Sequence, residues 1–229
     1  MEYQKLLNLD GILNSKLETQ PWQYKIIDDV IEPNAFFKIK TAAEKISKFQ
    51  KNDDYYSDGI WLNDLKDFGV DDVYDIIVQI SKEFLSIQKQ LLQQFNPYLE
   101  SKLGYYNIPK FNYSIDGLQS KIHDEGVTKT LALVIYVTPE SSMGTKVYDG
   151  PEEKNFIKDI EWKPNRAFLM CSQPGVTWHS YKNTGLPRFT LNLYYEKLES
   201  LINITKNFSE DRSFWFLNNM HENDLVSYI

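Results

Sequence analysis

Three residues of the chain could together hold a divalent metal ion. His123 and Glu125 stand two residues apart in LQSKIHDE (118–125), a segment typical of a β-strand, and His179 follows later in TWHSY. Side chains alternate along a strand, so His123 and Glu125 would face one side while Asp124 faces the other. Two imidazoles and one carboxylate on one face leave three octahedral positions open, which suits a redox-active iron with room for further ligands.

Arg188 extends this pattern, because it opens the strand-like RFTLNLYY a short distance after His179. A guanidinium at the rim of a barrel, close to a metal ligand, suits bidentate binding of a carboxylate. Neither feature is specific by itself, since H-x-E recurs by chance and an arginine often begins a surface strand. The four residues together favour an iron oxygenase much more strongly than any one of them.

The first third of the chain is predicted to be mainly helical. After the strand-like WQYKIIDDV (22–30), Pro33 opens a segment with apolar residues at helical spacing. A second amphipathic helix is predicted from about Asp71 until Asn96-Pro97 ends it. Each helix has one apolar face, which needs a sheet to cover it.

The pattern changes at about residue 108 to short runs of β-branched and aromatic residues separated by turns. These runs are PKFNYSI, LQSKIHDE, TLALVIYV, TKVYD, FIKDIEW, RAFLMCS, TWHSY and RFTLNLYY. Short strands at this spacing predict a β-sandwich or closed barrel, with the two helices packed on its outside.

Composition restricts the class of protein. A chain of 229 residues with 42% hydrophobic residues can bury one sizeable core. The net charge of -7 and the lack of a dense basic block argue against a nucleic-acid partner. The single cysteine, Cys171, excludes an internal disulfide and is expected to be a small core residue. No apolar run could span a membrane and no signal peptide is evident, so a cytoplasmic location is expected.

The stretch from about 108 to 196 resembles the 2-oxoglutarate/Fe(II)-dependent oxygenases of the prolyl-hydroxylase-like group. His123-Asp124-Glu125 matches the family's H-x-D/E, Trp178-His179 matches its distal histidine, and PRFTLNLYY matches its arginine-bearing strand. MGTKVYD and IEWKPNRAFLM are similar to two further strands of the family. The resemblance implies a mostly β fold with N-terminal α-helices, in which the helices pack outside a double-stranded β-helix, or jelly roll.

The resemblance also implies how the chain is organised. We expect a single oxygenase domain over 1–229, with a helical support region at 1–105, the jelly-roll catalytic core at 106–200 and a C-terminal tail at 201–229. His221, in that tail, is expected to be exposed and not a ligand.

The same resemblance assigns roles to site residues. Fe(II) would be held by His123, Glu125 and His179, and the far carboxylate of 2-oxoglutarate would be bound by Arg188 and Tyr136. Tyr113 would reach the end of the co-substrate nearest the metal. Because the chain has 15 tyrosines, both tyrosines could equally be core residues.

The implied activity is hydroxylation of a C–H bond, with consumption of 2-oxoglutarate and O2 and release of succinate and CO2. Ascorbate is a candidate reductant. A peptidyl proline is the leading substrate, and a free amino acid or other metabolite is the alternative. A non-catalytic jelly-roll binding protein would be expected to lack Arg188, and a cupin-like zinc or manganese enzyme would be expected to have more histidines. The oligomeric state stays open.

Two points of the sequence leave alternatives open. Most of the family has Asp where this chain has Glu125, and a β-bulge would make Asp124 the ligand instead. The aromatic and acidic segment 53–61 could form a substrate lid or groove, or a solvated loop.

Overall fold

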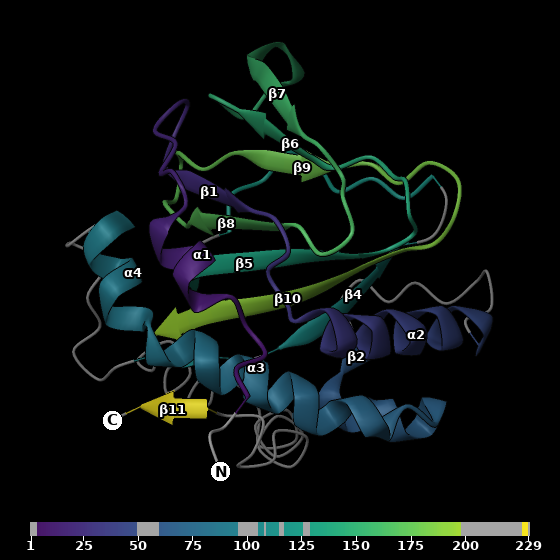
Figure 1. The fold of residues 1–229 in the computed structure, drawn as a ribbon. Helices are drawn as coiled ribbons and strands as arrows, with labels where there is room; N and C mark the ends of the chain where they lie inside the picture. The colour runs from purple at the N-terminus through teal and green to yellow at the C-terminus, as the bar shows by residue number, and fades with distance from the viewer. Residues whose placement is uncertain are drawn as a thin grey trace, which may run out of the picture.

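The computed structural model describes residues 4–49, 60–95, 105–107, 109–114, 117–125, 129–197 and, for the backbone alone, 226–228. Two antiparallel sheets face each other, and four α-helices lie against the larger one (Figure 1). No helix in these ranges is long and apolar enough to cross a membrane.

The larger sheet has the strand order β1-β8-β5-β10-β3-β11, with β4 also paired to β10 and β2 paired to β4. Its strands are β1 (Tyr24–Ile27), β2 (Ile60–Trp61), β3 (Tyr105–Asn107), β4 (Lys110–Ser114), β5 (Lys129–Thr138), β8 (Ala167–Cys171), β10 (Arg188–Lys197) and β11 (Val226–Tyr228). The smaller sheet has the order β7-β6-β9, formed by β6 (Thr145–Tyr148), β7 (Phe156–Ile160) and β9 (His179–Tyr181).

The chain passes repeatedly between the two sheets. β5 lies in the larger sheet, β6 and β7 in the smaller, β8 in the larger, β9 in the smaller and β10 in the larger. The sheets enclose an apolar layer that includes Trp22, Tyr136, Trp162 and Phe168. This alternation is the double-stranded β-helix, so the predicted fold class is confirmed.

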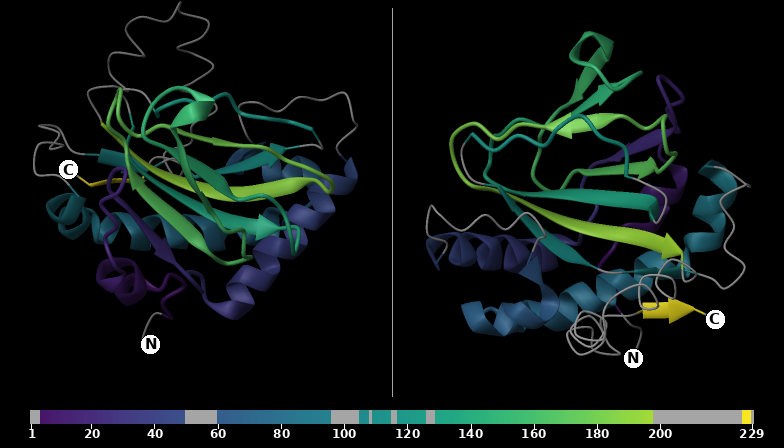
Figure 2. Two further views of the ribbon diagram at one scale, coloured as in Figure 1. Left: turned by 90° about the horizontal axis from the view of Figure 1, so that it is seen from above. Right: turned by 180° about the vertical axis from the view of Figure 1, so that it is seen from behind.

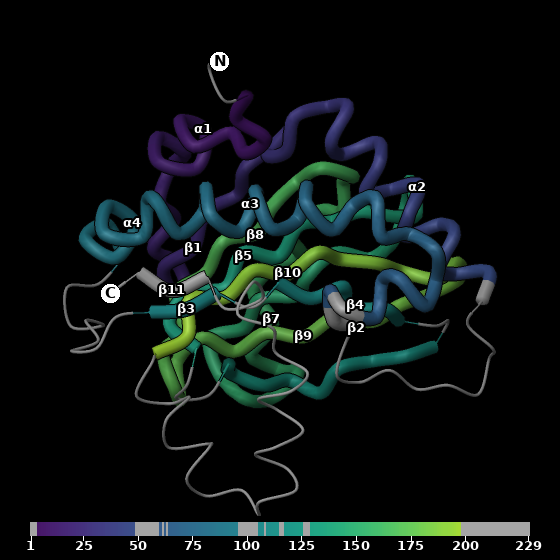
Figure 3. The backbone as a smooth tube through the Cα atoms, turned by 90° about the horizontal axis from the view of Figure 1, so that it is seen from below, coloured from purple at the N-terminus to yellow at the C-terminus, as the bar shows by residue number. Residues whose placement is uncertain are grey.

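The helices cover the face of the larger sheet that points away from the smaller one (Figures 2 and 3). They are α1 (Leu9–Asn14), α2 (Pro33–Phe49), α3 (Tyr74–Ser86) and α4 (Gln88–Phe95), with short 3-10 helices at Leu62–Phe68, Asp71–Val73 and Glu153–Asn155. Apolar residues of α2 and α3 such as Ile39 and Phe84 meet outward residues of β5 and β10 such as Leu133 and Leu191. The helices therefore pack outside the barrel, as predicted.

β10 separates the helix-facing core from the interior of the barrel. Its residues are almost all buried, because alternate side chains face the helices and the interior of the barrel. Phe189 and Leu191 belong to the helix-facing core, whereas Arg188, Thr190 and Asn192 line a cavity inside the barrel.

Two predicted elements differ from the structure. The long second helix is interrupted at Ile87, whose φ of -105° and ψ of 8° end α3 before α4 begins. The segment 118–125 is not a strand, and its backbone pairs beside the smaller sheet through isolated bridges, Gln119 with Lys182 and His123 with His179. The support region also contributes strands, since β1 and β2 join the larger sheet.

A buried lysine on β1 joins two of the helices. Lys25 is 1% exposed, and its ammonium donates to the carbonyl oxygens of Ile12 (3.0 Å) and Leu13 (2.8 Å) and to Oε1 of Gln94 (2.6 Å). The first two carbonyls belong to the last turn of α1, where a positive charge is favourable. Burial lowers the pKa of Lys25.

We predict that Lys25→Met lowers the free energy of unfolding by roughly 1–3 kcal/mol, because the helix carbonyls lose their buried partner. Denaturant titration followed by circular dichroism measures the loss. Lys16→Met is the control, since the pair of Lys16 with Glu18 is exposed and contributes little. Equal stability of the two variants would show that Lys25 does not stabilise α1.

Candidate metal centre

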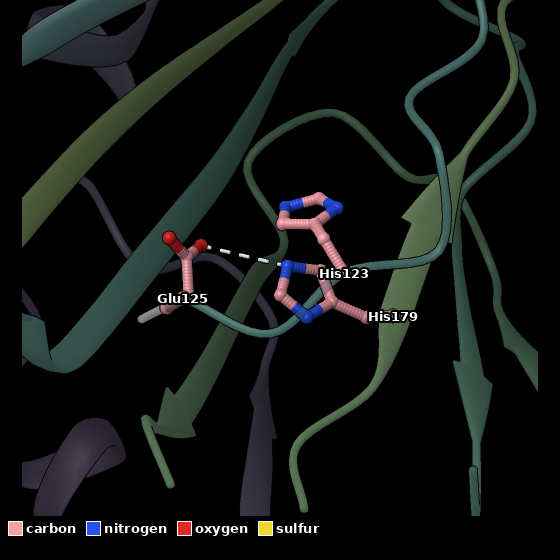
Figure 4. Close-up of side chains that lie close together, drawn as sticks. All are labelled: His123, Glu125 and His179. Carbon is pink, nitrogen blue, oxygen red and sulfur yellow. Dashed lines mark ion pairs between the residues drawn. The ribbon is translucent and has the colours of Figure 1, made fainter. Parts of the chain in front are cut away.

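Two backbone hydrogen bonds place the candidate histidines side by side. The amide of His123 donates to the carbonyl of His179 (3.0 Å), and the amide of His179 donates to the carbonyl of His123 (2.9 Å). Their ring centroids are 4.4 Å apart. The pairing ties the loop 117–125 to the first residue of β9, so residues far apart in the sequence present their rings to one space (Figure 4).

Glu125 completes the cluster. One ligand atom from each of His123, Glu125 and His179 lies within 4.8 Å of the other two. Oε1 of Glu125 is 3.5 Å from Nε2 of His179. Figure 4 marks this contact with a dashed line. The structure thus brings together the three residues that the sequence proposed as metal ligands.

Both imidazoles are held with Nε2 available. Nδ1 of His123 lies 2.8 Å from the carbonyl oxygen of Lys121, and Nδ1 of His179 lies 2.9 Å from that of Thr177. A carbonyl oxygen only accepts, so each Nδ1 carries a proton, and Nε2 is the nitrogen that each neutral ring would offer to a metal ion. This second contact also fixes the ring orientation, as it does for metal-binding histidines in general. Burial and the neighbouring His179 lower the pKa of His123, which favours its neutral form.

The Glu125 carboxyl is ionised in spite of its burial. Burial alone would raise its pKa, but the hydrogen bond with His179 and the charge of Lys129 outweigh that effect and hold the pKa well below its usual range. Nζ of Lys129 is 2.5 Å from Oε2 of Glu125. An anionic carboxylate beside two imidazoles is a donor set that fits a divalent cation.

Asp124 points elsewhere. Its Oδ2 accepts a hydrogen bond from the amide of Gly175 (2.6 Å), in the turn before β9. Although 118–125 is not a regular strand, the bridge at His123 gives the local extended backbone that separates neighbouring side chains. Glu125, and not Asp124, is therefore the carboxylate next to the histidines.

Arg188 is a buried cation that forms no ion pair with any carboxylate of the described residues. It is 2% exposed, and its Nε has no hydrogen-bond partner among those residues. The guanidinium carbon lies 4.4 Å from the ring centroid of Tyr181 and 4.9 Å from that of Trp162. Burial lowers the pKa of Arg188. A buried charge without a counter-charge is costly, so this position favours an anionic ligand.

The candidate ligands and Arg188 line one cavity of about 250 Å³ inside the barrel. Its walls come from β4, the loop 117–125, β5, β6, β8, β9 and β10, and the lining includes Asn112, Tyr113, Ser120, Lys129, Val134, Thr145, Phe168, Met170, Tyr181, Thr190, Asn192 and Tyr194. The three candidate metal ligands and the buried Arg188 therefore share one cavity.

The two tyrosines expected to bind the co-substrate are placed differently. The Tyr136 hydroxyl is fully buried; it donates to Oγ1 of Thr145 (2.9 Å) and accepts from the amide of Thr145 (3.2 Å). Thr145 lines the cavity and Tyr136 does not. Tyr113 lines the cavity, and its ring centroid lies 4.8 Å from that of Phe189.

Several cavity residues were not proposed from the sequence. Tyr181 could have been found, because it stands two residues after His179 on the same strand and so faces the same side. Lys129 gives no comparable signal, because its direction depends on an irregularity in β5. Cys171 is buried in β8, where burial raises the pKa of its thiol to about 12, as expected of a core residue. Residues 53–59 of the proposed lid segment 53–61, and His221, lie outside the described ranges.

Known structures share this fold, although no protein-family model and no curated protein sequence matches the chain. A prolyl-4-hydroxylase of Pseudomonas putida superposes with a TM-score of 0.54 at 9% identity, over 86% of this chain and 99% of that one. A Trichoplax adhaerens prolyl hydroxylase in complex with a hypoxia-inducible-factor peptide fragment gives 0.53 at 13% identity, over 85% and 91%. The non-haem α-ketoglutarate-dependent epimerase SnoN of nogalamycin biosynthesis gives 0.52 at 9% identity, over 76% of both chains. The chain has the fold of the prolyl-hydroxylase-like 2-oxoglutarate/Fe(II) oxygenases.

Proposed function

We propose that this protein is an Fe(II)- and 2-oxoglutarate-dependent oxygenase that hydroxylates a C–H bond. The reaction would convert 2-oxoglutarate, O2 and the substrate to succinate, CO2 and the hydroxylated product. The observation that carries the proposal is that His123, Glu125 and His179 share one cavity with Arg188, which has no carboxylate partner in the part of the chain that the structure describes. A structural ion-pair network would instead have given Arg188 a carboxylate.

Each polar residue of the cavity has a defined task in this proposal. His123 and His179 would bind the metal through Nε2, and Glu125 would bind it through a carboxylate oxygen. Bound iron would supply the oxidation chemistry, together with O2 and 2-oxoglutarate. Ascorbate is the candidate reductant that would return oxidised iron to Fe(II). Arg188 would bind the far carboxylate of the co-substrate through parallel hydrogen bonds.

The side chains around Arg188 hold its guanidinium in a fixed orientation. The rings of Tyr181 and Trp162 lie against the guanidinium, so the planar group is held by stacking. Val134, Phe168 and Met170 supply apolar parts of the wall of the same cavity. In such surroundings a charge-assisted pair is stronger than it would be in water. Tyr136 would act through Thr145, because its hydroxyl already binds that residue.

Arg166 shows the contrasting case of an arginine with a structural role. Its guanidinium contacts both oxygens of Asp28, with Nε to Oδ1 at 2.6 Å, and Oε2 of Glu161 at 3.0 Å. These ion pairs raise the pKa of Arg166, whereas burial lowers that of Arg188. These two arginines therefore have opposite electrostatic environments, because Arg166 has carboxylate partners and Arg188 has none among the described residues.

We predict that alanine substitution of His123, Glu125 or His179 weakens Mn(II) binding by more than about 100-fold, because loss even of outer-shell partners costs about 10–100-fold. Mn(II) replaces Fe(II) so that calorimetric titration can be done in air. Asp124→Asn is the control and should bind normally, since an amide oxygen can still accept from Gly175. Loss of binding in Asp124→Asn with retention in Glu125→Ala would overturn the choice of carboxylate.

We predict that Arg188→Gln weakens 2-oxoglutarate binding to the Mn(II) protein by about thirty-fold or more, since a buried charge-assisted pair is worth on the order of 2–5 kcal/mol. Metal binding should be nearly unchanged. The matched control is Arg166→Gln, which should leave 2-oxoglutarate affinity at the wild-type value.

The stability of the same variant separates lost binding from lost folding. Removing a buried, unpaired charge should leave the ligand-free Arg188→Gln protein at least as stable as wild type. Arg166→Gln should be less stable, because Asp28 and Glu161 lose their partner. Unchanged 2-oxoglutarate affinity in Arg188→Gln would show that another cation binds the co-substrate, and Lys182 would be tested next.

We further propose a peptidyl residue, proline first, as the substrate. This proposal rests on the resemblance of the sequence motifs and on the fold shared with two prolyl hydroxylases. The enzyme would be incubated with Fe(II), ascorbate and 2-oxoglutarate, and with a proline-rich peptide library or a metabolite extract. We expect peptides to gain the mass of one oxygen atom. A gain confined to metabolites would exclude the peptidyl substrate and retain the oxygenase.

A further inference from the structure

The two oxygens of the Glu125 carboxylate have different partners. Oε1 faces Nε2 of His179 at 3.5 Å, and Oε2 contacts the ammonium of Lys129 at 2.5 Å. The side chain of Glu125 is 9% exposed and that of Lys129 is 26% exposed, so the contact is largely sheltered from solvent. The carboxylate is thus held at both ends, with one oxygen beside the histidines.

A break in strand pairing directs Lys129 to this position. Tyr195 of β10 pairs with Leu131 of β5, but the next residue, Glu196, pairs with Lys129, so Thr130 is an extra residue. In a regular ladder Lys129 would face the helices, as Leu131 does. The bulge turns it into the cavity. It also leaves the buried Oγ1 of Thr130 with no hydrogen-bond partner among the described residues.

Among the described residues, Tyr194 and Glu196 are the aromatic and charged neighbours of Lys129 besides Glu125. Its Nζ lies 4.1 Å from the ring centroid of Tyr194, and Glu196 is its partner in the ladder. Oε2 of Glu196 already accepts a hydrogen bond from the Tyr106 hydroxyl (2.9 Å). The carboxylate that Lys129 contacts directly is therefore the one beside His179.

We propose that Lys129 is a positioning residue that occupies Oε2 of Glu125, so that the carboxylate offers only Oε1 to the metal. The inference rests on the proposed function. A carboxylate can bind a metal through one oxygen or through both. Glutamate has one more rotatable bond than the aspartate of most of the family, so it is less constrained by its own backbone.

The number of protein donors decides what else the metal can bind. Three donors leave three octahedral positions, which accommodate a chelating 2-oxo acid and one further small ligand. A carboxylate bound through both oxygens would make four donors, and the chelating co-substrate would fill the site. Lys129 would prevent that saturation.

The test counts exchangeable waters on bound Mn(II) by water-proton relaxation, first without and then with 2-oxoglutarate. Wild type should carry three waters and retain one after the co-substrate binds. Lys129→Met should carry two, a decrease of about one third, and retain none. Lys129→Arg, which keeps the positive charge, should restore the wild-type counts. Lys158→Met is the matched control, because Lys158 lies over Tyr24, away from the cavity.

Equal water counts in wild type and Lys129→Met, with and without 2-oxoglutarate, would overturn the inference while leaving the oxygenase intact. Absence of Mn(II) binding by wild type would overturn the proposed function and the inference with it. A purely structural lysine would change the melting temperature without changing the water count. If Lys129→Met does not fold, Lys129→Ala, which adds no apolar bulk, takes its place with the same expected counts.

Discussion

The pair of backbone hydrogen bonds between His123 and His179 is the contact on which the candidate site depends. Both bonds use main-chain atoms, so they position the two histidines whatever their side chains do. The pairing joins a loop without regular strand structure to the smaller sheet. Each ring is then oriented by a carbonyl of its own segment, at Lys121 and at Thr177. A site assembled in this way needs no metal to bring its ligands together.

The polar lining of the cavity depends on the two-layered packing of β10. The outward residues of β10 are covered by α2 and α3, which leaves the inward residues free to be polar. Asn192 and Tyr194 hydrogen-bond each other inside the barrel (2.8 Å). The helices do not line the cavity, but they cover the apolar face of β10, so that its other face can carry polar side chains.

Local patterns predicted the parts of the site that depend on local geometry. The periodicity of apolar residues predicts the two amphipathic helices and the strand that begins at Arg188. The i, i+2 spacing proposes His123 and Glu125 as a pair. The break at Ile87 and the turning of Lys129 into the cavity depend on contacts between distant segments. The sequence also could not predict the partner of the Tyr136 hydroxyl, because its hydrogen bond to Thr145 is a tertiary contact. Spacing can propose ligands, but it cannot show which hydroxyls are already engaged.

The buried guanidinium of Arg188, which forms no ion pair within the described ranges, has a consequence for the lifetime of the protein. An anion that fills the cavity would return the free energy lost when the positive charge was buried, and it would do so only in the folded state. Occupancy by a dicarboxylate would then slow global opening and proteolysis, since unfolding would have to release the ligand first. On this basis, cellular abundance would rise and fall with the supply of the 2-oxo acid, independently of transcription.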